Sequence, residues 1–324
     1  MDYILTFVLR VVPKWVLLHP KQTWSLWIFR RGERMNTNTI LKTVVELSVL
    51  LLLASCAPTS NSGGLSYQSS ATDQADIIGG VDGTLAYAKQ NGVVGIYDQQ
   101  KGGICTGSLI AANLVLTAGH CVNLENAEET IIFFGTSLDD IAKQAQSGNQ
   151  SNIRFVAKAA RHERFGEGRQ TDGPNHDVGL LKFEGTVPQG FKVAKMASME
   201  LSRGLRAGTE VTLAGYGLNK FKKDPVTGKQ LIGEGSGILR KVDKIKISSV
   251  LTSGEEIILD QTQGRGACHG DSGGPAYVFD KRLKATVVVG VTSRGSGNCD
   301  REAVYTGVMG YAQWIGQKSK ELMQ

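Results

Sequence analysis

The sequence lacks the features that mark nucleic-acid-binding and metal-binding proteins. It has no cluster of Lys and Arg interleaved with aromatic residues, no metal-ligand spacing, and no phosphate-binding or dinucleotide-binding glycine motif. The formal net charge is +6 over 324 residues, but seven Lys/Arg against three Asp/Glu precede Cys56, which leaves about +2 for the remainder. We therefore expect no nucleic-acid partner, no metal and no cofactor.

Long hydrophobic runs are also absent, since a membrane-spanning helix needs about 20 apolar residues. The N-terminal apolar segment is interrupted by Arg, Pro and Lys, and the run 47–54 is much shorter. This run ends in Leu-Ala-Ser-Cys at Cys56, which resembles a bacterial lipobox, the signal for acylation of a cysteine that becomes the new N-terminus. We expect an exported lipoprotein of the bacterial cell envelope, attached to the membrane through Cys56. The alternative is an ordinary signal peptide with an incidental cysteine.

Four segments are predicted along the chain. A basic segment begins at Met35 and leads to the lipobox, so 35–55 is interpreted as the lipoprotein signal peptide and 1–34 as a gene-start artefact or extended leader. Residues 56–76 contain almost no large apolar side chains, and we expect a flexible linker or propeptide. Residues 77–324 are predicted to form one folded domain.

The pattern of this domain is all-β. Glycine is frequent, with 40 residues against 7 prolines, and short apolar runs alternate with Gly-rich turns. Such runs occur at 93–97, 114–117, 131–134, 153–157, 178–183, 211–216, 242–247, 257–259 and 286–291. Many short strands indicate a barrel or a sandwich. Helical spacing from Tyr311 to Ile315, with a polar continuation to Gln324, predicts a C-terminal helix.

Three motifs together predict nucleophilic catalysis. The sequence Gly-Asp-Ser-Gly-Gly-Pro at 270–275 offers Ser272 as a nucleophile, but a serine hydroxyl needs an imidazole base that a carboxylate holds in position. His120, in Thr-Ala-Gly-His-Cys, is the expected base, and Asp177, in Asn-His-Asp-Val-Gly-Leu-Leu, is the expected carboxylate. Three histidines lack such a context and are expected to have no catalytic role: His162, His176 and His269.

The order His, Asp, Ser resembles that of the chymotrypsin-like proteases, not that of the subtilisins or the α/β-hydrolases. Further family motifs are Ile77-Ile78-Gly79-Gly80, Gly215-Tyr216-Gly217 and Ser293-Arg294-Gly295. From residue 77 to the C-terminus the chain is similar to the trypsin/chymotrypsin family of serine proteases. The resemblance implies two six-stranded antiparallel β-barrels with the active site between them, a closing C-terminal helix, and a monomeric serine endopeptidase that acts on proteins or peptides. The alternative is a non-catalytic homologue whose cleft binds a partner.

The resemblance also implies two disulfides, Cys105–Cys121 and Cys268–Cys299. An exported protease meets an oxidising compartment, in which such bridges persist. The alternative is four reduced core cysteines.

Two functions of the serine loop are further implied by the family. The backbone N–H groups of Gly270 and Ser272 would form an oxyanion hole. Asp271 would pair with the α-ammonium group created by cleavage before Ile77, so the hole should be malformed in an uncleaved zymogen. The bond to be cut, Asp76–Ile77, is not one that a trypsin-like activator would cleave, and the cut would release the domain from its lipid.

The expected substrate pocket is lined by Gly266, Ser293, Arg294, Gly295 and Ala303. Gly266 stands where family members that select Lys or Arg have Asp, so we expect no trypsin-like specificity. Gly295 and Ala303 leave the pocket open, which favours a medium or large apolar P1 side chain. An inward-pointing Arg294 or Arg301 would instead favour acidic P1 residues and cleavage of the chain's own Asp76–Ile77 bond. The lysine-containing loop 218–237 is interpreted as a solvated insertion, with an exosite or autolysis loop as the alternative.

Overall fold

The computed structural model describes residues 77–168, 173–220, 233–251 and 254–324. Cys56, the signal sequence, the linker and most of the lysine-containing loop lie outside these residues. Within the described ranges, no helix is long and apolar enough to cross a membrane.

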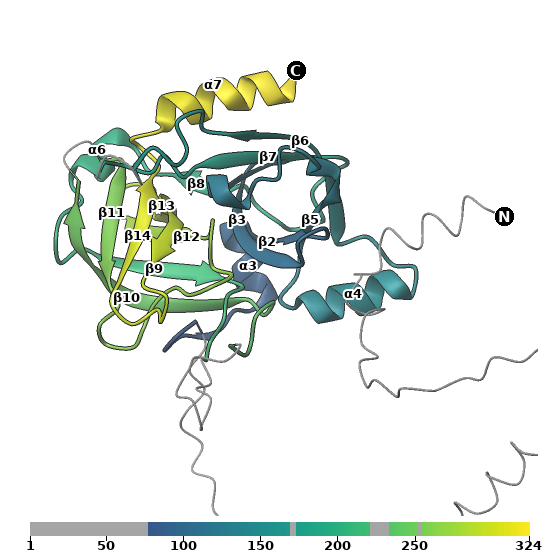
Figure 1. The fold of residues 1–324 in the computed structure, drawn as a ribbon, viewed down its shortest axis with the longest axis horizontal. Helices are drawn as coiled ribbons and strands as arrows, with labels where there is room; N and C mark the ends of the chain where they lie inside the picture. Colours follow the sequence, from purple (N-terminus) through teal and green to yellow (C-terminus); the bar gives the residue numbers. More distant parts are fainter. Residues whose placement is uncertain (1–76, 169–172, 221–232, 252–253) are drawn as a thin grey trace, which may run out of the picture. The chain divides into compact units, whose positions relative to one another are not determined.

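Six antiparallel strands close the first barrel in the order β2-β3-β4-β7-β6-β5, with β5 pairing back to β2 (Figure 1). They are β2 (Val93–Asp98), β3 (Gly103–Ala111), β4 (Leu114–Thr117), β5 (Thr130–Phe133), β6 (Ile153–Arg161) and β7 (Gly179–Phe183). Aliphatic and aromatic side chains fill the interior, and Phe134 packs edge-on against Phe183 and Phe191. Burial of this apolar surface drives the closure of the barrel.

A second closed barrel runs in the order β10-β11-β14-β13-β12-β9, with β9 pairing to β10. Its strands are β9 (Glu210–Gly215), β10 (Arg240–Val250), β11 (Glu256–Asp260), β12 (Pro275–Asp280), β13 (Ala285–Gly295) and β14 (Glu302–Gly307). Two short strands extend its sheet: β1 (Val81–Asp82) pairs with β10, and β8 (Lys195–Met196) lies parallel to β13. The prediction of two six-stranded barrels is confirmed.

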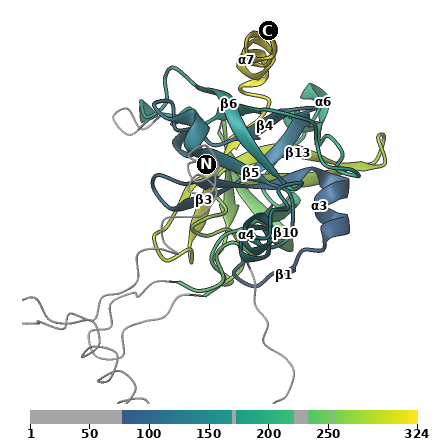
Figure 2. The same cartoon turned by 90° about the vertical axis from the view of Figure 1, so that its right-hand side faces the viewer.

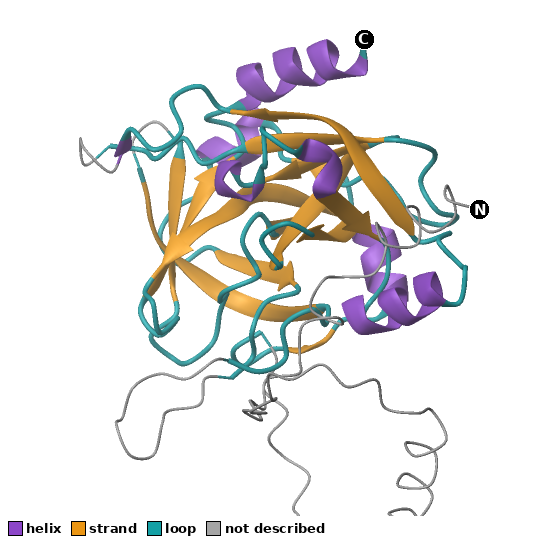
Figure 3. Ribbon diagram, turned by 45° about the vertical axis from the view of Figure 1, so that its right-hand side comes forward, coloured by secondary structure: helices purple, strands orange, loops and turns teal. Residues whose placement is uncertain are grey.

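The helices lie around the two barrels (Figure 3). They are α3 (Leu85–Asn91), α4 (Leu138–Gln146), α6 (Met199–Arg203) and α7 (Ala312–Met323), with 3-10 turns η2 (Gly119–Cys121) and η3 (Ala127–Glu129). The C-terminal helix α7 continues from the second barrel but packs on β6 and β7 of the first, where it is seen end-on in Figure 2. It therefore joins the barrels, and the predicted C-terminal helix is confirmed.

Tyr216 connects the two barrels at their centre. Its ring packs edge-on against Phe133 at 4.9 Å, and its hydroxyl donates a 2.6 Å hydrogen bond to the carbonyl of Gly135. Tyr216 is fully buried, so this contact fixes β9 against the end of β5. The residues at the facing ends of the barrels are thereby held in register.

Several elements were not predicted from the sequence. The strands β3, β12 and β14 contain Gly, Ser, Thr or Pro, which weakens the apolar signal, and neither α3 nor α4 was expected. Helix α4 begins after Ser137, whose hydroxyl accepts from the backbone N–H of Asp140. Asp177 lies two residues before β7, the strand that corresponds to the predicted run 178–183.

Candidate active site

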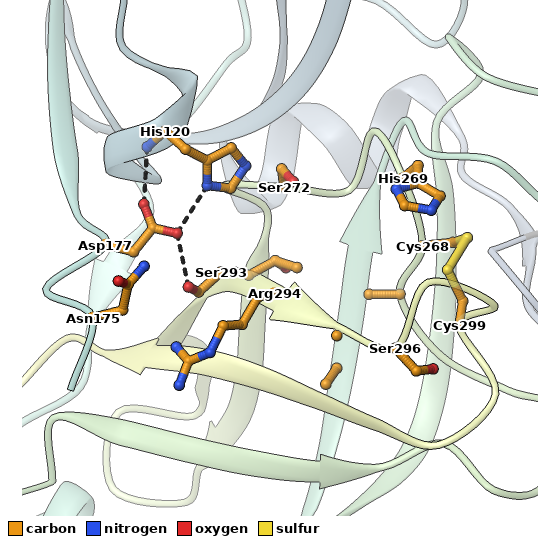
Figure 4. A pocket seen from close by; sticks show the side chains of 14 residues that line it. His120, Asn175, Asp177, Cys268, His269, Ser272, Ser293, Arg294, Ser296 and Cys299 are labelled. Carbon is orange, nitrogen blue, oxygen red and sulfur yellow. Dashed lines mark hydrogen bonds and ion pairs between the residues drawn. A yellow bond between two sulfur atoms is a disulfide. The ribbon is translucent and has the colours of Figure 1, made fainter. Parts of the chain in front are cut away.

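The two barrels bring His120, Asp177 and Ser272 into one pocket (Figure 4). His120 lies in η2, which follows β4, and Asp177 lies two residues before β7, the neighbour of β4 in the first barrel. Ser272 comes from the loop between β11 and β12 of the second barrel. Residues that are distant in sequence therefore meet because two independent barrels face one another.

Asp177 is a buried acceptor with three donors. Its Oδ1 accepts a 2.9 Å hydrogen bond from the His120 backbone N–H, and its Oδ2 lies 2.8 Å from His120 Nδ1. Ser293 Oγ donates a 2.7 Å hydrogen bond to the same Oδ2. A carboxylate only accepts, so Nδ1 carries the proton in this contact, and in the neutral ring Nε2 is left as the acceptor.

Ser272 lies beyond the imidazole ring of His120, on the side away from Asp177 (Figure 4). Its backbone is anchored to the first barrel, because the Thr106 N–H donates a 2.7 Å hydrogen bond to the Ser272 carbonyl. The buried Thr106 hydroxyl donates to the Gly270 carbonyl and accepts from the Tyr216 N–H, both at 3.0 Å. One β3 residue thus positions both ends of the serine turn. Sequence reasoning missed Thr106, although it follows Cys105 directly.

Backbone hydrogen bonds hold two carbonyls of the serine loop. The His269 carbonyl accepts from the Leu218 N–H, and the Asp271 carbonyl accepts from the Gly274 N–H, both at 2.8 Å. In a trans peptide the N–H points opposite to the carbonyl. The N–H groups that follow these carbonyls, those of Gly270 and Ser272, therefore point away from Leu218 and Gly274.

Gly270 is required for this turn. Its φ is +100°, and a Cβ added there would lie 2.8 Å from the Cα of Gly217. Any other residue would be strained in both backbone conformation and packing.

Asp271 is 1% exposed, and its carboxyl accepts two backbone hydrogen bonds. The donors are the N–H groups of Gly217 and Cys268, each at 2.8 Å. Burial raises the pKa of Asp271 to about 7, while these two N–H groups and the nearby Arg240 act in the opposite direction. The side chain is therefore a buried acid in an environment that disfavours its charge.

The segment that starts at Ile77 is docked against the second barrel. Ile77 is fully buried in the core cluster of that barrel, and the Gly266 N–H donates a 2.8 Å hydrogen bond to the Ile78 carbonyl. Ile77 has a φ of +40°, a left-handed conformation that is strained for a β-branched residue. Such strain costs about 1–3 kcal/mol.

The pocket beside the triad has two walls joined by a disulfide. One wall contains Ala267 and Cys268, and the other contains Ser293, Arg294, Gly295, Ser296, Cys299 and Ala303. Cys268 is bonded to Cys299 across them (Figure 4), and Cys105 is bonded to Cys121 beside His120. Both predicted disulfides are confirmed. Of the predicted pocket residues, Gly266 alone is not part of this lining; the Gln261 side chain lies against it.

Arg294 forms a two-pronged ion pair with Glu256. Its Nη1 and Nη2 lie 2.6 Å and 2.9 Å from the two carboxylate oxygens. Glu256 is buried and also accepts a 3.0 Å hydrogen bond from the Asn175 N–H. Arg301, on the pocket loop, is exposed and does not line the pocket. Neither Glu256 nor this pairing was expected from the sequence.

His176 and His162 stack at 5.1 Å next to the site. His176 is buried, and its Nδ1 lies 2.9 Å from the hydroxyl of Tyr311, the residue before α7. Burial lowers the pKa of both imidazoles, so neutral rings are favoured here. The pair links α7 to the segment that carries Asp177. His269 lies at the pocket edge, with Nε2 3.1 Å from the Gly297 carbonyl.

This fold and this arrangement of side chains are those of the trypsin-like serine proteases. Residues 81–315 match the Trypsin family model, and the chain belongs to that family. It is 26% identical over 252 residues to Venom serine protease 34 of Apis mellifera, a match covering 74% of this chain and 57% of that protein. It is 27% identical to Serine protease SP24D of Anopheles gambiae, over 65% of this chain and 70% of that protein. It is also 27% identical to human Kallikrein-8, over 65% of this chain and 75% of that protein. The chain thus spans little more than half of the honeybee relative.

Proposed function

We propose that the chain hydrolyses peptide bonds in protein substrates through an acyl-enzyme formed on Ser272. His120 Nε2 would take the hydroxyl proton as Ser272 attacks the carbonyl, and would then give it to the leaving amine. Water would hydrolyse the ester in a second pass through the same steps. The observation that carries this proposal is the placement of His120 Nδ1 on Asp177 Oδ2, because it leaves Nε2 as the acceptor on the ring.

The N–H groups of Gly270 and Ser272 are proposed as the oxyanion hole. The hydrogen bonds that the His269 and Asp271 carbonyls accept support this, because they fix the N–H groups of Gly270 and Ser272 on the opposite side of each peptide. Donors held in place before the reaction need no reorganisation when negative charge develops. One such donor contributes on the order of 10²–10³ in rate.

Cleavage before Ile77 is proposed as the activation step. In the uncleaved chain Ile77 is held in a left-handed conformation, and a cut at its N-terminal side removes that constraint together with its strain. The cut also creates an α-ammonium group on a fully buried residue, while Asp271 is a buried acid without a full compensating charge. An ion pair between the two would satisfy both and hold the serine loop in place.

An uncharged P1 side chain is proposed for the substrate. A pocket without a carboxylate at Gly266 offers no partner for Lys or Arg, and the Arg294 charge is already paired with Glu256. With Arg301 exposed, neither arginine supports the acidic alternative.

Export and membrane anchoring complete the proposal. The disulfides support folding in an oxidising compartment. The lipobox-like sequence supports acylation of Cys56, with 56–76 as a linker to a domain formed by 77–324 and with release on activation.

The test uses the full-length chain with residues 72–76 replaced by an enteropeptidase recognition sequence. A fluorophosphonate should label the protein much faster after cleavage, because the ion pair with Asp271 would keep the serine loop in this conformation, and peptide hydrolysis should rise with the label. Ser272→Ala should abolish both. A cleaved, folded chain that takes no label would favour the non-catalytic alternative, whereas full labelling before cleavage would refute activation at Ile77.

A further inference from the structure

The Gln261 side chain lies against Gly266, the residue expected at the floor of the substrate pocket. Gln261 follows β11 directly and is 1% exposed. A methyl group built on Gly266 would overlap the carboxamide of Gln261. Gln261 therefore fills the space that a side chain on Gly266 would take, and neither residue is part of the pocket lining.

Hydrogen bonds hold this carboxamide between the two pocket walls. Gln261 Oε1 accepts a 2.6 Å bond from the Ala267 N–H, and Nε2 donates to the Ala267 carbonyl at 3.1 Å. The second Nε2 donor reaches the Cys299 carbonyl on the opposite wall at 3.5 Å. The backbone is fixed as well, because the Gln261 N–H donates a 2.7 Å bond to the Arg301 carbonyl. To swing the side chain out, a substrate would have to break these buried contacts, at about 1–3 kcal/mol for each group left unpaired.

We infer that Gln261 determines P1 specificity by limiting the depth of the pocket. This inference rests on the proposed function and narrows its substrate class to small uncharged P1 side chains, such as Ala and Val, in place of the medium or large side chains expected from Gly295 and Ala303. Both Nε2 donors are in use, so the floor offers no N–H to an acidic side chain. A neutral amide oxygen also cannot balance a buried Lys or Arg.

The test measures kcat/KM on peptides that differ only at P1, with the enteropeptidase-activated full-length chain. Ala and Val should be cleaved at least about tenfold faster than Phe, since a size mismatch in an apolar pocket changes rates about 10–200-fold. In Gln261→Ala the preference for Ala and Val over Phe should fall about tenfold or reverse. Gln263→Ala, an exposed glutamine two residues further along, is the matched control and should keep the wild-type profile.

Fluorophosphonate titration separates this inference from the proposed function. A chain that takes no label and cleaves no peptide contradicts the proposed function. A labelled wild-type enzyme that cleaves after Phe faster than after Ala or Val overturns the role of Gln261, and so does a labelled Gln261→Ala with an unchanged profile. If Gln261→Ala does not fold, the kcat/KM values of the wild-type enzyme on the Ala, Val and Phe peptides decide alone.

Discussion

Ser293 Oγ donates a 2.7 Å hydrogen bond to Asp177 Oδ2, the carboxylate oxygen that also faces His120 Nδ1. Ser293 belongs to β13 of the second barrel, while Asp177 lies next to β7 of the first. This contact therefore ties the orientation of the imidazole to the packing between the barrels.

Ser293→Ala should lower kcat/KM about tenfold. A hydrogen bond to a charged group is worth about 1.5–3 kcal/mol, but Asp177 keeps two donors from His120. Steady-state kinetics on the best small-P1 peptide measure the loss. Ser147→Ala, at the exposed C-cap of α4, is the control. An unchanged rate in Ser293→Ala would show that His120 alone orients the carboxylate.

Thr106→Val should lower kcat about tenfold with little change in KM. Valine preserves the volume but leaves the Gly270 carbonyl and the Tyr216 N–H without the hydroxyl, which loosens the turn that carries the proposed oxyanion donors. Thr262→Val, on an exposed loop, serves as the comparison. If Thr106→Val lost stability but kept the wild-type kcat, the role of Thr106 would be purely structural.

The stability of the uncleaved chain should fall as pH rises from about 4 to about 7. The folded pKa of Asp271 is about 7, above its ordinary value of 3.8, so in this range the folded state binds more protons than the unfolded state. The free energy of unfolding should drop by a few kcal/mol relative to Asp271→Asn. Urea unfolding of both chains at several pH values measures it. If the free energies of unfolding of the two chains changed with pH in the same way, the raised pKa of Asp271 would be contradicted.

The cleaved chain should lose most of this pH dependence. An α-ammonium group near Asp271 favours the carboxylate and would bring its pKa down again. The same urea series on the enteropeptidase-cut chain tests this point. If its free energy of unfolding still fell as steeply with rising pH, the pairing of Ile77 with Asp271 would be contradicted.

Glu256→Gln should destabilise the domain by about 1–3 kcal/mol. It leaves the Arg294 guanidinium beside a neutral amide, but Arg294 is 43% exposed, so water offsets part of the lost pairing. The loss should be smaller in the background of Arg294→Ala, where no charge is left unpaired. A double-mutant cycle by urea unfolding measures the coupling, and additive losses would exclude a direct interaction.

The motifs carry the resemblance to one protease family, and this resemblance predicted the two barrels and both disulfides. Gly270, Asp271 and Ser272 follow one another in the chain, whereas Cys105 lies in β3 and Cys121 in η2, the turn after the neighbouring strand β4. The weakly apolar strands β3, β12 and β14 were missed, since their strand structure depends on neighbours in a closed sheet and not on their own composition.

What the sequence by itself determined is the family and the candidate reacting groups: a serine, a histidine and an aspartate in motifs shared with one protease family. Only the tertiary structure decided how the pocket around them is shaped. It sets Gln261 over Gly266, pairs Arg294 with Glu256 and places Thr106 under the serine turn. Each of these contacts joins side chains or backbone from different elements, and their positions depend on how the strands of two barrels pack, which no local pattern encodes.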